Sequence, residues 1–224
     1  MYLEKINFQN QIIESLVREA IAANDIHPPK ERPHLESRLL FKKNSSGDVK
    51  YTGDVNDQGY AKFTEIARRF ARAKELHGLR VQSFVQYSLS DELEKTIINE
   101  LPEYLTALDP KISVQITVGG RALTPHKDHS RECSMFYLYS EPDVKTTWWE
   151  KSSDFEEFAD LRYADPDKIT PVKTEIIEKD RWYLFNNNEY HSIHALEDKD
   201  IHRVTLLLEF NVPMVDLYNL LNND

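Results

Sequence analysis

The chain has very little cysteine and no long hydrophobic run. Cys133 is the single cysteine among 224 residues, so an intramolecular disulfide framework is excluded and a reducing compartment is expected. No apolar run follows a basic stretch near the N-terminus, and none approaches the about 18 apolar residues that a membrane span needs. We therefore expect a cytoplasmic protein that does not enter a membrane.

Positive charge is also scarce. The chain has 28 basic and 38 acidic residues, which gives a formal net charge of −10. Affinity for nucleic acid depends on neutralising phosphates with Lys and Arg, so nucleic acid is not expected as a partner. One predicted helix does carry Arg68, Arg69, Arg72 and Lys74. We interpret this cluster mainly as a solvated helix surface, with a local basic face as the alternative.

What the chain does contain is enough apolar material for a packed core. Hydrophobic residues make up 40% of the sequence and aromatic residues 11%, which is typical of a globular protein rather than a disordered one. The length suits one domain with a full core. Because no internal repeat or domain-scale linker is visible, we expect a single domain over residues 1–224.

Helical spacing of apolar residues dominates the first half. It predicts helices over residues 9–24, 60–76 and about 90–101, and a short one over 215–221. Ser90 is expected to cap the third helix, and Pro102 to break or kink it. Residues 25–59, rich in Pro, Gly and polar residues, predict a long loop with a weak hairpin, and residues 152–171 an acidic loop or short helix. Either loop could border a binding site, although both could be ordinary connections.

After Pro110 the apolar period changes from helical to two. This order of helices followed by strands predicts an α+β protein, with helices packed on one sheet of a β-sandwich or jelly roll. The helical part is expected at about 1–110 and the jelly-roll core at about 111–212. A strand is also predicted within residues 79–89. The expected core strands cover residues 112–118, 133–139, 145–150, 173–178, 182–185, 191–196 and 202–211.

An imidazole and a carboxylate stand two residues apart in His126-Lys127-Asp128. In an extended segment, residues i and i+2 share a face, and this donor pair suits a divalent metal such as Fe(II). His191 offers a third ligand. Two imidazoles and one carboxylate occupy one face of an octahedral metal and leave the opposite positions open, as in non-haem Fe(II) oxygenases. A surface turn at Pro125 is the alternative interpretation of the first pair.

The last predicted strand carries polar residues on one face. Val204, Leu206 and Leu208 form an apolar face, whereas Arg203 and Thr205 lie on the other. We expect helices to cover the first face and a polar cavity to meet the second. An anionic co-substrate at the open metal positions needs a counter-charge at its far end, and the planar guanidinium of Arg203 can bind a carboxylate through two hydrogen bonds. A pairing of Arg203 with Glu209 or Asp128 is the structural alternative.

The combination His-x-Asp, then His, then Arg-x-Thr resembles the 2-oxoglutarate- and Fe(II)-dependent dioxygenase superfamily, in its prolyl-hydroxylase-like members. The resemblance covers about residues 112–212 and implies a double-stranded β-helix. Thr205 departs mildly from the Arg-x-Ser that is common there, but keeps the hydroxyl. The intact Asp128 resembles the hydroxylating members; halogenating relatives have a small residue at that position.

The resemblance also implies the roles of particular residues. His126, Asp128 and His191 would bind Fe(II), Arg203 with Thr205 would bind the C5 carboxylate of 2-oxoglutarate, and Tyr137 would hydrogen-bond that carboxylate. Tyr137 as a plain core aromatic is the alternative. The third ligand could instead be His194, but the two lie on opposite strand faces and the family pattern favours His191. No catalytic side chain beyond the metal site is expected.

The implied reaction uses O₂ and 2-oxoglutarate to hydroxylate a C–H bond of a small-molecule or peptidyl substrate, with succinate and CO₂ as by-products. Two other functions remain open. A cupin-like metalloenzyme would use the metal without 2-oxoglutarate and would not need Arg203. A non-catalytic jelly-roll binding module would bind neither metal nor 2-oxoglutarate. The sequence does not indicate the oligomeric state.

Overall fold

The structure is a computed structural model, and it describes residues 1–27, 41–43, 49–51, 64–65, 68, 71–72, 75, 83–120, 122–128, 131–142, 144–155, 164–196 and 200–222. Within these ranges, none of the helices combines the length and apolar character that crossing a lipid bilayer requires.

Most of the described chain belongs to two antiparallel sheets. The larger has six strands in the order β1-β10-β7-β12-β5-β4, and the smaller has four in the order β6-β11-β8-β9. A separate hairpin, β2-β3, matches the hairpin expected in the 25–59 loop. The strands are β1 (Leu3–Lys5), β2 (Phe41–Lys43), β3 (Val49–Tyr51), β4 (Ser83–Tyr87), β5 (Lys111–Val118), β6 (Ala122–His126), β7 (Cys133–Leu138), β8 (Val144–Lys151), β9 (Ile169–Ile176), β10 (Trp182–Asn186), β11 (Tyr190–Ala195) and β12 (His202–Phe210).

The predicted helices are present where the chain is described. They are α1 (Gln11–Ala22), α4 (Asp91–Glu100), α5 (Glu103–Thr106) and α6 (Met214–Asn222), and a 3-10 turn, η1, covers Pro166–Lys168. The Ser90 hydroxyl caps α4 by accepting from the Leu93 N–H at 3.3 Å, as expected. Pro102 separates α4 from α5. Of the helix expected over 60–76, residues 64–65, 68, 71–72 and 75 are described, and all are helical.

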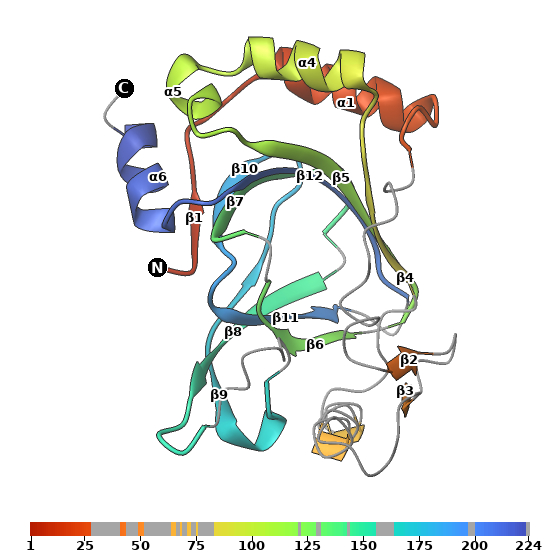
Figure 1. Cartoon of the computed structure of the whole chain (residues 1–224), viewed down its shortest axis with the longest axis vertical. Helices are drawn as coiled ribbons and strands as arrows, with labels where there is room; N and C mark the ends of the chain where they lie inside the picture. Colours follow the sequence, from red (N-terminus) through yellow and green to blue (C-terminus); the bar gives the residue numbers. More distant parts are fainter. Residues whose placement is uncertain are drawn as a thin grey trace.

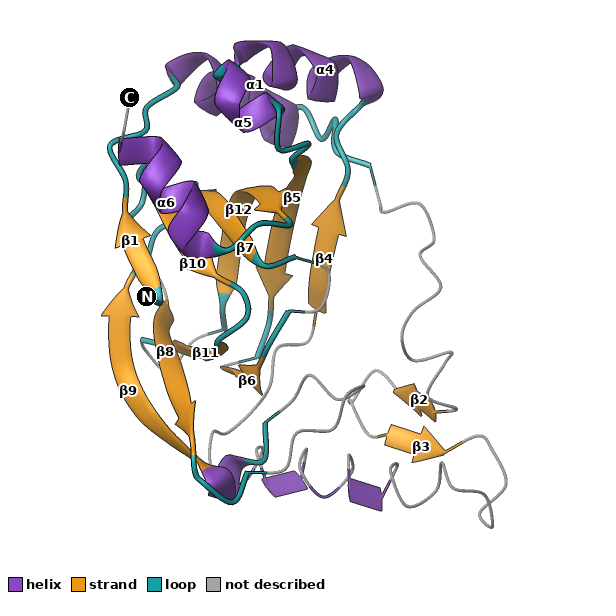
Figure 2. Ribbon diagram, turned by 60° about the vertical axis from the view of Figure 1, so that its left-hand side comes forward, coloured by secondary structure: helices purple, strands orange, loops and turns teal. Residues whose placement is uncertain are grey.

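The helices cover the outer face of the six-stranded sheet (Figures 1 and 2). One apolar face of α1 and one of α4 supply Ile13, Val17 and Ile97, which are fully buried. They pack in one cluster with Leu206 and Leu208 of β12. The apolar face predicted for the last strand is therefore confirmed as the helix-facing side.

A second apolar cluster fills the space between the two sheets. It joins Phe136 of β7 and Leu207 of β12, from the six-stranded sheet, to Trp148 of β8 in the four-stranded sheet. Because side chains alternate along a strand, Arg203 and Thr205 lie on the same face of β12 as Leu207. They therefore face the four-stranded sheet rather than the helices.

The observed architecture agrees with the expected class: mostly antiparallel sheets with a few helices on one side. Two strands of the larger sheet come from before residue 110, in the part that was expected to be mainly helical. β4 extends the six-stranded sheet at one edge, and β1 pairs with β10 at the other. The N-terminal part thus contributes both edge strands of this sheet as well as the helices that cover it.

Candidate metal centre

Two neighbouring strands of the smaller sheet bring the two predicted histidines together. β6 and β11 pair antiparallel, with His126 directly opposite His191. Their ring centroids lie 4.5 Å apart. Directly opposed residues in a ladder project to the same face, so both imidazoles lie on the side of the sheet that carries Trp148, the other ladder neighbour of His191.

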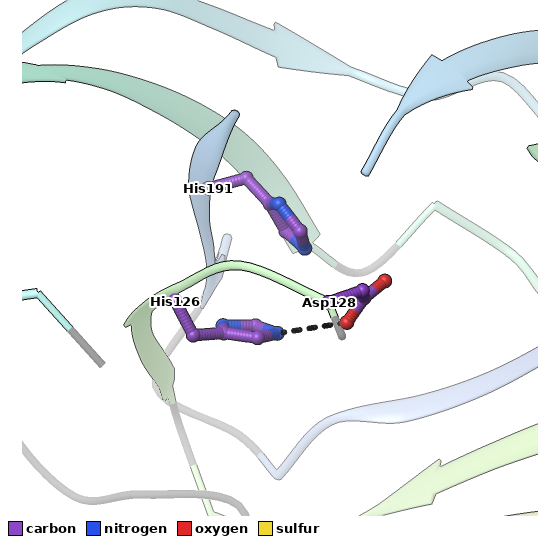
Figure 3. Close-up of side chains that lie close together, drawn as sticks. All are labelled: His126, Asp128 and His191. Carbon is purple, nitrogen blue, oxygen red and sulfur yellow. Dashed lines mark ion pairs between the residues drawn. The ribbon is translucent and has the colours of Figure 1, made fainter. Parts of the chain in front are cut away.

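Asp128 follows β6 and completes the group (Figure 3). One potential ligand atom from each of His126, Asp128 and His191 lies within 4.8 Å of the other two. Asp128 Oδ1 lies 3.8 Å from His126 Nε2. Ligands about 2.1 Å from one metal ion are at most about 4.2 Å apart, so small side-chain rotations would bring all three onto one ion.

Backbone contacts orient both imidazoles toward this centre. His126 Nδ1 lies 2.8 Å from the Thr124 carbonyl oxygen, and His191 Nδ1 lies 2.9 Å from the Glu189 carbonyl oxygen. A carbonyl can only accept, so each Nδ1 carries the hydrogen and the Nε2 of a neutral ring carries the lone pair. Burial lowers the pKa of His191, which favours the neutral ring. In its neutral form, each ring would therefore bind a metal through Nε2.

Asp128 is held through its other oxygen. Its Oδ2 accepts from Asn187 Nδ2 at 2.6 Å and from Nη2 and Nε of Arg131 at 2.8 and 3.1 Å. Burial alone would raise the pKa of Asp128, but the charge and the hydrogen bonds of the Arg131 guanidinium hold it well below its usual value. The carboxylate is thus ionised, with Oδ2 engaged by the protein and Oδ1 directed toward His126.

Arg131 and Glu209 form a buried ion pair that the sequence analysis missed. Arg131 Nη1 contacts Glu209 Oε1, and the side chains are only 8% and 2% exposed. The signal was present in the sequence: Glu209 shares the strand face of Arg203, Thr205 and Leu207, and a buried carboxylate needs a cationic partner. The alternative pairing of Arg203 with Glu209 or Asp128 is not what the structure shows, because Arg131 binds both carboxylates.

Arg203 and Thr205 lie where the strand pattern placed them, on the face of β12 toward the smaller sheet. The Arg203 guanidinium lies over the Phe136 ring, with 5.7 Å from its Cζ to the ring centroid. Phe136 packs on Phe185, which in turn meets the His191 ring edge-to-face at 4.8 Å. The Arg203 charge also contributes to the lowered pKa of His191. Arg203 is therefore on the side of the fold that holds the three potential ligands.

Tyr137 does not join this group, which corrects the expectation for that residue. It lies opposite Leu206 in the β7–β12 ladder, and so shares the helix-facing side of the sheet. Its hydroxyl donates to Asp180 Oδ1 at 3.2 Å, and its ring packs on Trp182 with centroids 5.4 Å apart. Tyr137 is thus a core aromatic on the face opposite Arg203, and cannot reach a ligand of Arg203 between the sheets.

The acidic 152–171 segment abuts one ligand strand. The Ala164 N–H donates to the carbonyl of Pro125, the residue before His126, at 3.0 Å. The next residues bind the basic helix surface: Arg68 pairs with Asp165, and Arg72 Nε lies 3.0 Å from Asp167 Oδ1. These two arginines therefore face carboxylates of their own chain. Arg69 and Lys74 lie outside the described residues.

Other residues considered in the sequence have structural places. His194 is not in the three-residue group, which contains His191 instead. Cys133 is fully buried, its thiol donates to the Val212 carbonyl at 3.1 Å, and burial raises its pKa to about 12. Trp148 and Trp182 are buried core residues, whereas the Trp149 indole donates to the Ser192 hydroxyl at 2.8 Å.

No protein-family model and no curated protein sequence matches this chain. Among solved structures, it is similar to the ribosomal oxygenase YcfD of Escherichia coli, with 16% identity over 60% of this chain and 35% of that one and a TM-score of 0.37. It is also similar to the non-haem α-ketoglutarate-dependent epimerase SnoN of nogalamycin biosynthesis, with 12% identity over 70% and 74% of the two chains and a TM-score of 0.38. A third is the vicilin of Corylus avellana, at 12% identity, 60% and 30% coverage and a TM-score of 0.34. The alignments span about a third of the oxygenase and the vicilin. At these values the similarities carry no conclusion about activity, and we base the function on the site itself.

Proposed function

We propose that this protein is a non-haem Fe(II)- and 2-oxoglutarate-dependent oxygenase that hydroxylates a C–H bond of a small-molecule or peptidyl substrate. The observation that carries the proposal is the convergence of His126, Asp128 and His191 at the end of one strand pair, on the side of the fold that also holds Arg203. The order of the strands, the donor atoms and the buried polar groups between the sheets each support it.

The strand order supports a double-stranded β-helix. Along the chain from β5 to β12, the strands β5, β7, β10 and β12 lie in the larger sheet and β6, β8, β9 and β11 in the smaller. The chain therefore crosses repeatedly between two facing sheets, as it does in a jelly roll. Helices α1 and α4 cover the larger sheet from outside, as the predicted fold requires.

The donor set fits Fe(II). Two imidazole nitrogens and one carboxylate oxygen, supplied from one side of the centre, are the ligands of non-haem Fe(II) oxygenases. His126 and His191 would bind through Nε2, because their Nδ1 atoms are engaged by backbone carbonyls. Asp128 would bind through Oδ1, because three donors occupy Oδ2.

Polar groups on the inner faces of the two sheets would also suit an oxygen-rich anion. Among the described residues, the buried hydroxyls of Thr146 and Thr205 and the buried indole N–H of Trp148 have no hydrogen-bond partner in the protein. Thr146 and Trp148 share one face of β8, and Thr205 lies on the inner face of β12. A buried donor without a partner costs about 1–3 kcal/mol. The carboxylate of 2-oxoglutarate, bound to Arg203, would supply acceptors for such donors.

The protein's own residues would position the reactants rather than move protons. His126, Asp128 and His191 would hold the metal, and Arg203 with Thr205 would bind the far end of 2-oxoglutarate. The buried aromatic residues Phe136, Phe185 and Trp148, which pack between the sheets, would exclude water from the bound reactants. Fe(II), 2-oxoglutarate and O₂, when bound, would supply the oxidation itself, in which 2-oxoglutarate is converted to succinate and CO₂ as the substrate gains a hydroxyl.

The test is turnover of 2-oxoglutarate. With Fe(II), O₂ and ascorbate, the purified protein should convert 2-oxoglutarate to succinate slowly without substrate, and faster when the right substrate is supplied from a panel of peptides and metabolites. A protein that binds Fe(II) but neither binds nor consumes 2-oxoglutarate would contradict the proposal and favour a cupin-like metalloenzyme. A protein stabilised by neither Fe(II), Mn(II) nor 2-oxoglutarate in a thermal-shift assay would favour a binding module.

A further inference from the structure

A buried charged network lies behind Asp128, on the side away from the imidazoles. Arg131 binds Asp128 Oδ2 with Nη2 and Nε, at 2.8 and 3.1 Å, and binds Glu209 with Nη1. Glu209 also accepts from Gln86 Nε2, and the same nitrogen lies 2.7 Å from the Ser113 hydroxyl. This network ties the segment after β6 to β12, β4 and β5. Asp128 is thus anchored to the larger sheet, while the two histidines belong to the smaller one.

The charges in this network are unequal. Asp128 and Glu209 are two carboxylates around one guanidinium, and burial would lower the pKa of Arg131 if the two carboxylates did not raise it. An arginine that paired with Asp128 alone would cancel its charge and weaken it as a ligand for a cation. Because Arg131 is shared with Glu209, the group keeps a net negative charge. The sharing therefore lets Arg131 orient Asp128 without neutralising it.

We propose that Arg131, held by Glu209, is a positioning residue that fixes Asp128 as a one-oxygen metal ligand, and that Glu209 maintains the negative charge on which cation binding depends. This inference rests on the proposed metal site. Neither residue contacts the metal or the co-substrate in this account. Both act through Asp128, so their effects should be visible in metal affinity and in the spectrum of the bound ion, independently of turnover.

The decisive variant removes both buried charges together. Arg131→Met alone would leave Glu209 buried without its cation, and Glu209→Met alone would leave Arg131 bound only to Asp128. An apolar replacement of a whole buried ion pair, by contrast, is often tolerated by the fold. We expect Arg131→Met/Glu209→Met to keep a cooperative thermal transition, at a lower midpoint than the wild type because Asp128 loses Arg131 as a cationic partner and keeps Asn187 as a donor. Its Mn(II) affinity, measured by calorimetry, should fall about 10–100-fold, the range found when outer partners of metal ligands are lost.

The visible spectrum of bound Co(II) gives a second measure. The double variant should show altered band positions or intensities, because Asp128 is no longer held by one oxygen. The matched control is Lys5→Met/Glu178→Met, which removes an exposed ion pair of 2.8 Å and should leave both measurements unchanged. If the double variant binds Mn(II) and Co(II) as the wild type does, the inference is overturned and the ion pair is structural only.

Two conservative variants cover the case in which the double variant does not fold. Arg131→Lys keeps the charge but cannot grip Oδ2 with two nitrogens, and Glu209→Gln keeps the shape but removes the second negative charge. Both should weaken Mn(II) binding while the protein stays folded; unchanged affinity in both would overturn the inference. A wild-type protein that binds neither Mn(II) nor Co(II) would instead contradict the proposed function itself, so the two failures are distinguishable.

Discussion

Replacing Asp128 by alanine is expected to lower the Mn(II) affinity at least about 100-fold, since even the loss of an outer partner of a metal ligand costs about 10–100-fold. Asp128 supplies the sole carboxylate of the three-residue group. Its loss would leave two neutral imidazoles, which hold a hard divalent cation weakly. The change in affinity can be measured by calorimetric titration, and 2-oxoglutarate turnover should fall with it.

The fold should survive this substitution. Arg131 would still pair with Glu209, so no buried cation is left without a partner. Asp154→Ala is a suitable control, because Asp154 is exposed and pairs with Ser152 and Lys168 near the surface. It should bind Mn(II) like the wild type. Full Mn(II) affinity in a folded Asp128→Ala protein would show that the metal is bound elsewhere.

Arg203→Ala is expected to raise the dissociation constant for 2-oxoglutarate about 30-fold or more, because truncating one partner of a buried, hydrogen-bonded charge pair costs about 2–5 kcal/mol. Mn(II) affinity should hardly change, since Arg203 is not one of the three residues proposed to hold the metal. The variant therefore separates the affinity for 2-oxoglutarate from the affinity for the metal. It can be measured by titrating 2-oxoglutarate into protein that is already saturated with Mn(II).

Arg203→Lys should recover part of the loss, because a lysine keeps the charge but not the planar pair of donors. Arg18→Ala is the matched control: Arg18 is an exposed arginine that pairs with Asp180 at 2.9 Å on the helix-covered side. It should leave the affinity for 2-oxoglutarate unchanged. If Arg203→Ala binds and turns over 2-oxoglutarate like the wild type, Arg203 does not anchor the co-substrate, and a metalloenzyme that works without it would be favoured.

The proximity of His126 and Asp128 was predictable because short-range geometry determines it. His126 and Asp128 are two residues apart, so their proximity follows from local extended structure. Arg203 and Thr205 were placed correctly because one face of their strand is purely apolar. His191 required more: its position opposite His126 depends on the pairing of β6 with β11, which alternation alone does not determine. The choice of His191 over His194 came from the resemblance to the dioxygenase superfamily.

Tyr137 was misplaced for a definite physical reason. Every side chain of β7 is buried, on both faces of the strand. Where both faces are buried, the pattern of apolar residues does not reveal which face meets the helices. The position of Tyr137 follows only from its ladder partner, Leu206. β1 was missed for a related reason: with three residues, it is too short to show any period.

The Arg131–Glu209 pair could have been found in part. Glu209 interrupts an apolar strand, which indicates a buried cation nearby, but the strand pattern offered Arg203, on the same strand face, rather than Arg131. The choice depends on where Asp128 and Arg131 lie after β6, and the described residues there make long-range backbone contacts. The Asp128 N–H donates to the Asn187 carbonyl at 3.1 Å, and the Asn187 N–H donates to the Glu132 carbonyl at 3.0 Å. Such contacts join segments about sixty residues apart and leave no local trace in the sequence.

The most direct test of the whole account is the affinity for 2-oxoglutarate with and without a metal. The proposed site binds the co-substrate at two points, the metal held by His126, Asp128 and His191 and the guanidinium of Arg203. We therefore predict that calorimetry detects 2-oxoglutarate binding to Mn(II)-loaded protein under anaerobic conditions, and much weaker or no binding to metal-free protein. Equal affinity in the two states, or no binding in either, would contradict the account.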